Sequence, residues 1–271
     1  MIEMTSLLFH ISYYSNSKKR VDNKNNIQKS SIEYRNFIIE NIKKFLGEID
    51  LYTSFTKKVV VFDINIENTD IYKINFKEYS SIEVKIKEYS FQNEHPFRLT
   101  TKHRFSMIKE IENFDWFGYS EDDTIITNET IKYIVRHLNS FYKEEKKVFT
   151  IPRMVYNKKG EYFYSDIIQP SPLRGKYISP RNRFGACWIY SKEIMKEWVK
   201  NPSFFNFSYP NINGGIRVKM GSGFMERVAL IPFDIKKKEP FIESVHLGYS
   251  GDYYFKHNSG FHTLKKNKLC L

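Results

Sequence analysis

The chain of 271 residues carries 43 Lys and Arg against 31 Asp and Glu, a formal charge of +12, and 41% of its residues are hydrophobic. This composition can form a sizeable core and excludes an intrinsically disordered chain. Cys187 and Cys270 form neither a disulfide framework nor a CxxC metal pair, and no stretch approaches the roughly 20 apolar residues of a membrane span. We therefore expect a cytoplasmic protein with anionic partners, although positive charge can also serve solubility alone.

The first third of the chain alternates between strand and helix patterns. Residues 6–14 are β-prone, and residues 31–46 repeat apolar side chains at helical spacing, with Gly47 as the expected end of that helix. Residues 48–55 and 57–66 are typical of the next strands, and an alternating stretch at 72–91 indicates further strands. This β-α-β order predicts an α/β fold.

Two helices and a buried strand are expected in the middle of the chain. Apolar residues at helical spacing predict a helix over 100–112, and the aromatic run DWFGYS at 115–120 predicts the strand. Thr127 should cap the following helix, whose apolar stripe runs from Ile131 to Phe141. No linker or internal repeat follows, so 1–271 reads as a single domain.

The later elements are less regular. We expect a hairpin from 148–157 and 161–168 that turns at NKKG, then a strand over 184–191. The segment SKEIMKEWVK predicts a short helix, and a Gly-rich region precedes another short helix that begins near Ser222.

Three adjacent carboxylates, Glu121, Asp122 and Asp123, come directly after the buried strand. Ligands of open α/β sheets bind at the carboxyl ends of the strands. Neighbouring carboxylates in a confined site repel each other, and a hard divalent cation such as magnesium or manganese relieves that repulsion. The alternative is an acidic turn that helps to cap the helix after Thr127.

The segment HPFRLTTKHRFSMIKEIENFDWFGYSEDDTIIT at 95–127 resembles glycosyltransferases of the GT-A fold, which carry an acidic DXD-type motif at the end of a strand. The resemblance implies a Rossmann-like mixed central sheet flanked by helices. It implies a nucleotide-sugar-binding half at 1–127 and an acceptor-side half at 128–271. The motif here reads E-D-D, and the resemblance favours Asp123 and then Asp122 as ligands of a manganese or magnesium ion.

The same resemblance suggests which residues surround the donor. Those expected to bind it are His10, Tyr13, Arg98, His103, Arg104, Glu121 and Asp122, with Ser12 and Lys102 beside them. Cationic groups before the acidic triplet could meet a diphosphate. The alternatives are ordinary sheet residues for the first strand and a solvent-exposed helix face for 98–104.

Further roles fall on the second half of the chain. The resemblance implies a His near the C-terminus as third metal ligand, with His246 preferred and His257 second. Lys256 and the basic tail could cover the diphosphate. The general base, if the reaction inverts, is expected to be Glu226, with Asp166, Glu193 and Asp252 as alternatives, and Asp123 is expected to act through the metal. Arg181 and Arg183 are expected to contact an acceptor or a phosphate.

These expectations together predict a metal-dependent, hexosyltransferase-like enzyme. It would move a sugar from a UDP- or GDP-linked donor to a glycan, lipid-linked or protein acceptor, with peripheral contact to the inner face of an anionic membrane as an open possibility. A nucleotidyltransferase is one alternative, although the first strand is followed by no Gly-rich phosphate loop. A non-catalytic nucleic-acid-binding protein is another, although its cationic residues are dispersed and nucleic acid is not an expected partner.

Overall fold

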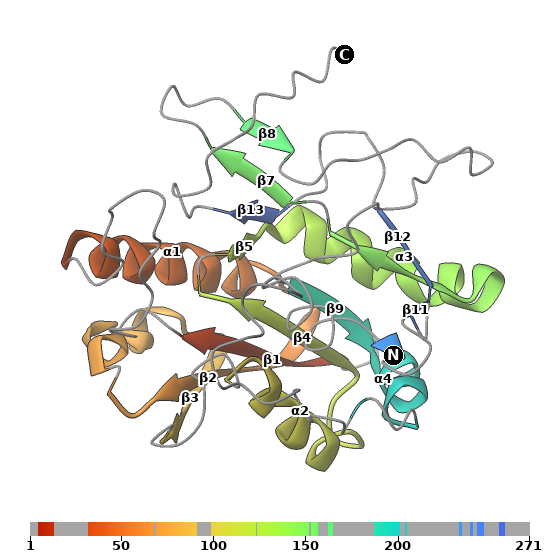
Figure 1. Ribbon diagram of the computed structural model, residues 1–271, viewed down its shortest axis with the longest axis horizontal. Helices are drawn as coiled ribbons and strands as arrows, with labels where there is room; N and C mark the ends of the chain where they lie inside the picture. Colours follow the sequence, from red (N-terminus) through yellow and green to blue (C-terminus); the bar gives the residue numbers. More distant parts are fainter. Residues whose placement is uncertain are drawn as a thin grey trace, which may run out of the picture.

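The structure of the chain is a computed structural model, shown as a ribbon in Figure 1. The described residues are 5–13, 32–67, 69–90, 99–122, 124–151, 153–156, 162–164, 187–200, 204, 233–234, 239–240, 243–246 and 255–257. Of the sequence-predicted elements, the short helix near Ser222 lies outside these residues.

A five-stranded sheet forms the centre of the molecule, in the order β3-β2-β1-β4-β9. The first four strands are parallel, and β9 runs antiparallel to β4. The strands are β1 (Thr5–Tyr13), β2 (Phe55–Asn65), β3 (Ile82–Tyr89), β4 (Trp116–Glu121) and β9 (Cys187–Ser191). With helices on both faces, this is the mixed α/β fold that the sequence predicts.

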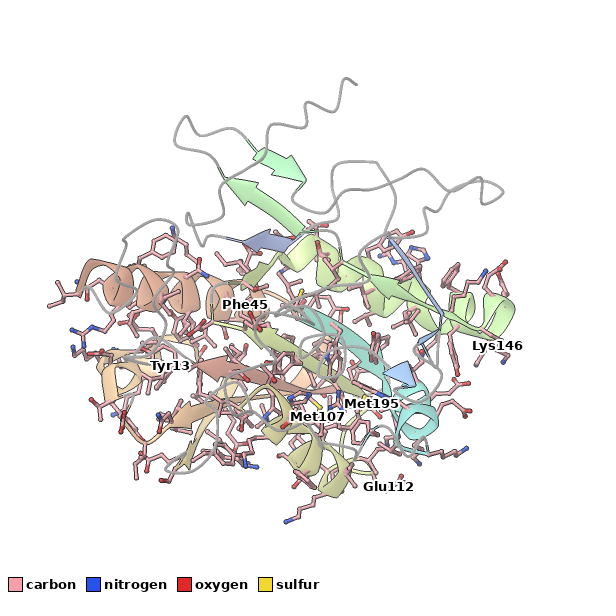
Figure 2. The ribbon with its side chains drawn as sticks, viewed as in Figure 1. Tyr13, Phe45, Met107, Glu112, Lys146 and Met195 are labelled. Carbon is pink, nitrogen blue, oxygen red and sulfur yellow. The ribbon has the colours of Figure 1, made fainter. Side chains whose placement is uncertain are left out.

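Helices cover the two faces of this sheet, with α1 and α3 on one side and α2 on the other (Figure 1). They are α1 (Ile32–Asp50), α2 (Leu99–Lys109), α3 (Asn128–Glu145) and α4 (Lys192–Val199), with 3-10 turns η1 (Thr69–Lys73) and η2 (Phe76–Glu78). Figure 2 shows Phe45 of α1 and Met107 of α2 on opposite sides of the central strands. Both side chains are fully buried.

Alternation along β1 divides its side chains between the two faces. Phe9 faces α1, where its ring meets that of Phe45 edge to face at 5.2 Å between centroids. Gly118 of β4 lies opposite Phe9, and a Cβ there would come within 2.2 Å of the Phe9 ring. The absence of a side chain at Gly118 therefore makes room for Phe9. His10 and Ser12 belong to the opposite face, which α2 covers.

A second sheet joins distant parts of the chain in the order β5-β13-β7-β8. Its strands are β5 (Thr124–Ile126), β13 (Phe255–His257), β7 (Arg153–Tyr156) and β8 (Tyr162–Tyr164). Two-stranded pairs are formed by β6 (Lys147–Thr150) with β12 (Glu243–His246), and by β10 (Phe233–Asp234) with β11 (Glu239–Pro240). The antiparallel pairing of β7 with β8 confirms the inner part of the predicted hairpin, whereas residues 148–150 of its predicted first arm belong to β6 and pair with β12.

Two sequence-based expectations about the first third are wrong. The first helix does not end at Gly47 but continues to Asp50, so residues 48–50 are helical and 55–65 is a single strand. The buried Lys58 explains the extension, because its Nζ donates to the carbonyl oxygens of Ile49 at 3.0 Å and Asp50 at 2.8 Å. The stretch 72–91 holds one strand, β3, preceded by 3-10 turns.

The predicted start of α3 is confirmed. Thr127 is the N-cap, and its side-chain oxygen accepts a hydrogen bond from the backbone N–H of Thr130 at 3.3 Å. None of the helices in the described part of the chain combines the length and the apolar character needed to cross a bilayer.

Candidate functional site

The carboxyl ends of β1 and β4 lie side by side, and the acidic triplet begins there. Ser12 of β1 pairs with Glu121, the last residue of β4. The backbone N–H of Asp122 donates to the carbonyl oxygen of Ser12 at 3.2 Å, and the Tyr119 hydroxyl donates to Ser12 Oγ at 2.9 Å. Tyr13, the final residue of β1, is buried at the same edge. Predicted donor residues from β1 and from the acidic motif are thus brought together.

Helix α1 holds the acidic segment from the other side. Asn41 is 2% exposed, and its Nδ2 donates to the carbonyl oxygen of Asp122 at 3.2 Å. Glu48, two turns further along α1, accepts from the backbone N–H of Asn128 at 2.7 Å. The peptide groups on both sides of Asp122 are therefore fixed, one by β1 and one by α1. Asp122 itself is buried, with 4% of its surface exposed.

The contacts given for the start of α3 come from residues outside the triplet. The N-cap of α3 is Thr127, and the first helical N–H, that of Asn128, bonds to Glu48. Glu121 belongs to β4 and is half-buried, and Asp122 is buried in the turn beyond it. Asp123 lies outside the described residues. Thr127 and Glu48 thus meet the backbone N–H groups of Thr130 and Asn128 at the start of the helix.

A buried polar network lies under this edge on the α2 face. His10 Nδ1 and Asp63 Oδ2 are 2.7 Å apart, and both side chains are fully buried. The Tyr89 hydroxyl donates to Asp63 Oδ1 at 3.1 Å, and burial together with the Asp63 charge raises the pKa of Tyr89. A carboxylate oxygen can only accept, so the Nδ1 of His10 is the donor in its contact with Asp63. Its Nε2 is buried with no hydrogen-bond partner among the described residues.

His103 of α2 completes this polar layer. Its ring stacks on Tyr119 at 4.2 Å and lies 6.2 Å from that of His10, centroid to centroid. Burial lowers the pKa of His103 well below its usual range, and the positive charge of Arg104 adds to the effect. His103 is therefore a neutral imidazole at neutral pH. It can exchange hydrogen bonds with a ligand, but it does not bring a positive charge to a diphosphate.

Arg104 is also buried, and the described contacts engage it in packing. Its Nη1 donates to the carbonyl oxygen of Phe204 at 2.9 Å, and its guanidinium lies 5.1 Å from the ring centroids of Trp198 and Phe204. The expectation that these α2 residues could form a solvent-exposed helix face is wrong for His103 and Arg104, which are at most 1% exposed. Lys102 is half-buried, with its Nζ 5.6 Å from the centre of the Tyr89 ring.

Several of the predicted site residues lie outside the part of the chain that the structure describes, and two others are located only through the pairing of their strands. Those outside the described residues are Arg98, Asp123, Asp166, Arg181, Arg183, Glu226 and Asp252. Strand register places two others: His257 of β13 pairs with Thr124, directly after the triplet, whereas His246 of β12 pairs with Thr150. Two histidines were expected as the third metal ligand. Of these, His257 is the one whose strand pairs with the residue directly after the triplet.

The chemistry of the acidic edge suits a hard divalent cation. Carboxylate oxygens are the ligands that magnesium and manganese prefer, and Glu121 and Asp122 supply them at the end of a parallel strand. Within the described part of the chain, no three His, Cys, Asp or Glu side chains are grouped closely enough to hold a metal. Magnesium also takes water and substrate phosphate oxygens as ligands, so one or two protein carboxylates suffice to hold it.

Four residues that the structure places around the site were not predicted: Asn41, Glu48, Asp63 and Tyr89. Asp63 leaves a signal, because it is a single carboxylate inside the apolar run VVVFDI of β2. A buried lone carboxylate needs a partner. The partner's identity depends on the register of β1 against β2, which the sequence does not display.

No model of a known protein family matches the chain, and no curated protein matches its sequence. Solved structures with a similar fold include two crystal structures of TarS from S. aureus, a glycosyltransferase. The first has a TM-score of 0.45 at 13% identity and is matched over 94% of this chain and 37% of TarS. The second, TarS 1–349, has a TM-score of 0.42 at 12% identity, over 93% of this chain and 60% of that one.

This chain thus spans less than two thirds of each TarS chain that it matches. These similarities concern the arrangement of helices and strands. The activity of this protein has to be inferred from its own residues.

Proposed function

We propose that this protein is a glycosyltransferase that uses a nucleotide-sugar donor, with UDP- or GDP-linked sugars as the candidates, and a divalent cation. The observation that carries the proposal is the fixed position of Asp122. Its backbone is hydrogen-bonded to β1 on one side and to α1 on the other, at the carboxyl end of a parallel sheet. Such an edge is where α/β proteins bind nucleotides.

The proposed metal ligands are Asp122 and Asp123, with His257 now preferred over His246 because of its pairing with Thr124. A cation held there would neutralise the diphosphate of the leaving nucleotide. His10, Tyr13 and His103 would line the donor side. In this arrangement His103 would serve as a neutral hydrogen-bonding group.

The transfer itself exchanges one bond for another. The acceptor hydroxyl oxygen bonds to the anomeric carbon, the bond from that carbon to the diphosphate oxygen breaks, and the nucleoside diphosphate leaves. In an inverting reaction a carboxylate takes the hydroxyl proton, and Glu226 is our proposed base. Arg181 and Arg183 are proposed to contact the acceptor, which the half from residue 128 would bind.

Thermal unfolding with a panel of nucleoside diphosphates and nucleotide sugars, with and without manganese, tests this proposal. A ligand at about 100 times its Kd should stabilise the protein by about 2.7 kcal/mol. We expect a manganese-dependent rise in Tm with one nucleotide, and we expect D122N and D123A to abolish it. E129Q removes an exposed carboxylate that pairs with Lys132, and this control should keep the full rise.

Absence of any nucleotide-dependent shift in the wild-type protein would contradict the proposal. An equal shift in D122N, D123A and wild type would show that the acidic edge does not hold the ligand.

A further inference from the structure

Helices α1 and α2 cover opposite faces of the same sheet with side chains of different character. Each helix has seven buried residues among those that the structure describes. In α1 six of the seven are apolar, and Asn41 is the exception. In α2 five of the seven are polar: Thr100, Thr101, His103, Arg104 and Ser106. Burial of apolar surface therefore contributes little to the attachment of α2, which depends on individual hydrogen bonds and ring contacts.

Two of these hydrogen bonds hold the C-terminal half of α2. The Lys87 Nζ of β3 donates to Ser106 Oγ at 2.7 Å, and the Arg104 Nη1 donates to the carbonyl oxygen of Phe204 at 2.9 Å. Both donors carry a positive charge, which makes such hydrogen bonds stronger than neutral ones. Neither bond involves β1 or the acidic segment, so this half of the helix is anchored independently of them.

The N-terminal turn of α2 is connected to the sheet through Ser12, near the end of β1. The fully buried Ser12 hydroxyl donates to the carbonyl oxygen of Leu99 at 3.4 Å and accepts from the Tyr119 hydroxyl at 2.9 Å. The first of these distances is long for a hydrogen bond between oxygens. The Tyr119 ring stacks on His103, one turn further along α2. Ser12 and Tyr119 thus form one unit that supports the first turns of the helix.

The same serine also holds the acidic segment. The Ser12 carbonyl oxygen accepts from the backbone N–H of Asp122 at 3.2 Å, and its strand neighbour in β4 is Glu121. Ser12 therefore contacts α2 with its side chain and Asp122 with its backbone. Because both contacts belong to one residue, a change in the position of the first turn of α2 is passed directly to Asp122.

From these contacts we propose that Ser12 is a positioning residue, which couples the docking of α2 to the position of Asp122. This proposal rests on the proposed glycosyl transfer, in which Asp122 holds the cation. Ser12 acts through Asp122 and has no direct contact with the metal or the donor in this role. Coupling between two sites is reciprocal. A cation and nucleotide bound at Asp122 should therefore hold the first turns of α2 more firmly against Ser12.

Manganese affinity in the presence of UDP or GDP tests the positioning role. Electron paramagnetic resonance measures it, at a temperature well below the Tm of every variant so that all of them are folded. S12T and S12V have the same shape and add the same bulk, but only S12T keeps a hydroxyl. We expect S12V to bind manganese about tenfold more weakly than S12T, a loss within the range of one buried hydrogen bond.

A second pair of variants adds no bulk to the core. Y119F removes the donor to Ser12 Oγ and keeps the ring that stacks on His103. Its control is Y190F, which removes an equally buried hydroxyl that has no hydrogen-bond partner in the described part of the chain. We expect weaker manganese binding in Y119F and wild-type binding in Y190F. This pair decides the question if S12T and S12V fail to fold.

Hydrogen exchange tests the reciprocal effect on the helix. Manganese with nucleotide should slow exchange of the amides 103–106 in the wild-type protein by about tenfold, and Y119F should reduce this slowing. A purely structural role of Ser12 and Tyr119 would change the exchange rates of the free protein without changing the response to ligand.

The outcomes separate this proposal from the proposed function. Equal manganese affinities in S12T and S12V, equal losses in Y119F and Y190F, or α2 exchange that the ligand leaves unchanged would overturn the role of Ser12. Binding of manganese and nucleotide by the wild-type protein would leave the glycosyltransferase proposal standing in each of these cases. Absence of that binding in the wild type would overturn the proposed function and the role of Ser12 together.

Discussion

The two faces of the central sheet differ in character although they are made by the same strands. On the α1 face, β1 and β4 meet through Phe9 and Gly118, and Phe45 packs against them. On the α2 face, the same two strands present His10 and Tyr119 to α2, within a layer of hydrogen-bonded and stacked polar rings. Both faces are buried, so the contrast does not reflect exposure to water.

This contrast separates the requirements of folding from those of a site. An apolar face needs only complementary shape, whereas each polar group on the opposite face must find a partner or lose stability. The polar face ends at the acidic edge, where Ser12 and Asp122 are joined through the backbone. We expect substitutions on the polar face to affect both stability and ligand binding, and those on the apolar face to affect stability alone.

Removal of the buried carboxylate on the polar face should have the largest effect. D63A leaves His10 and the Tyr89 hydroxyl without their shared acceptor, and loss of one partner of a buried pair costs about 3–5 kcal/mol. Urea unfolding measures the change. E40A, which breaks an exposed pair with Lys43, is the control and should leave the transition unmoved. Equal behaviour of the two variants would show that the network does not stabilise the fold.

On the apolar face, G118A should destabilise the protein by about 1–3 kcal/mol, because the new methyl group overlaps the Phe9 ring and the strands must separate to accept it. G47A is the matched comparison. Nothing lies within 4 Å of a Cβ at Gly47, which is inside α1, so alanine there should stabilise by about 0.5–1 kcal/mol. Thermal unfolding should show a lower Tm for G118A and a higher Tm for G47A. An unchanged Tm in G118A would disprove the close contact between Gly118 and the Phe9 ring.

Where the two faces meet, N41L removes the donor to the Asp122 carbonyl and leaves that oxygen buried. The cost should be about 1–2 kcal/mol in urea unfolding. Under the proposed function, the manganese-dependent Tm rise with nucleotide should also shrink, because Asp122 is less firmly held. The control N36L changes an exposed asparagine of the same helix. A full ligand response in N41L would separate Asn41 from the site.

The smallest expected effect is a pH dependence from His103. Its pKa is lowered in the folded state, so below the ordinary value of 6.5 the unfolded chain binds a proton that the folded chain does not. Stability should therefore fall as the pH drops below 6.5, by at most about 1.4 kcal/mol per pH unit from this group. H103F keeps a ring against Tyr119 and should flatten the curve between pH 6.5 and 5. An unchanged slope in H103F would assign the dependence to other groups.

The sequence predicts the elements whose signals are local. The Thr127 cap, the strand before the acidic triplet and the hairpin of β7 and β8 all depend on neighbouring residues, and they are confirmed. The end of α1 is predicted wrongly because its last carbonyls are satisfied by Lys58, which follows from the next strand. A glycine in a helix is a strong local stop signal, but a tertiary contact overrides it here.

The candidate site also combines local signals with long-range ones. Glu121 and Asp122 can be recognised from the sequence because three acids follow an aromatic strand. The residues that hold the polar groups in place cannot be recognised in this way, because Asn41 lies 81 positions from Asp122 and Asp63 lies 53 positions from His10. Asn41 in particular resembles any polar residue of an amphipathic helix until its contact is known. Sequence reasoning therefore locates the acidic edge but not the groups that hold it in place.

The pairing of β13 has a consequence for the order in which the molecule assembles. β13 lies between β5 and β7, and His257 pairs with a residue more than 130 positions earlier. Contacts so distant in sequence form slowly, since a long loop must close before they give any stability. The parallel strands β1 to β4 can pair once residue 121 has been synthesised, whereas β5 receives its β13 partner only after residue 257.

During translation, the acidic edge would thus exist for a time without its neighbouring strand. Three-residue strands also open more readily than long ones, because few hydrogen bonds hold them. Hydrogen exchange should accordingly show early protection in β1 and β2 and late, weak protection at Thr124–Ile126. The last part of the site to form would then also be the first to open.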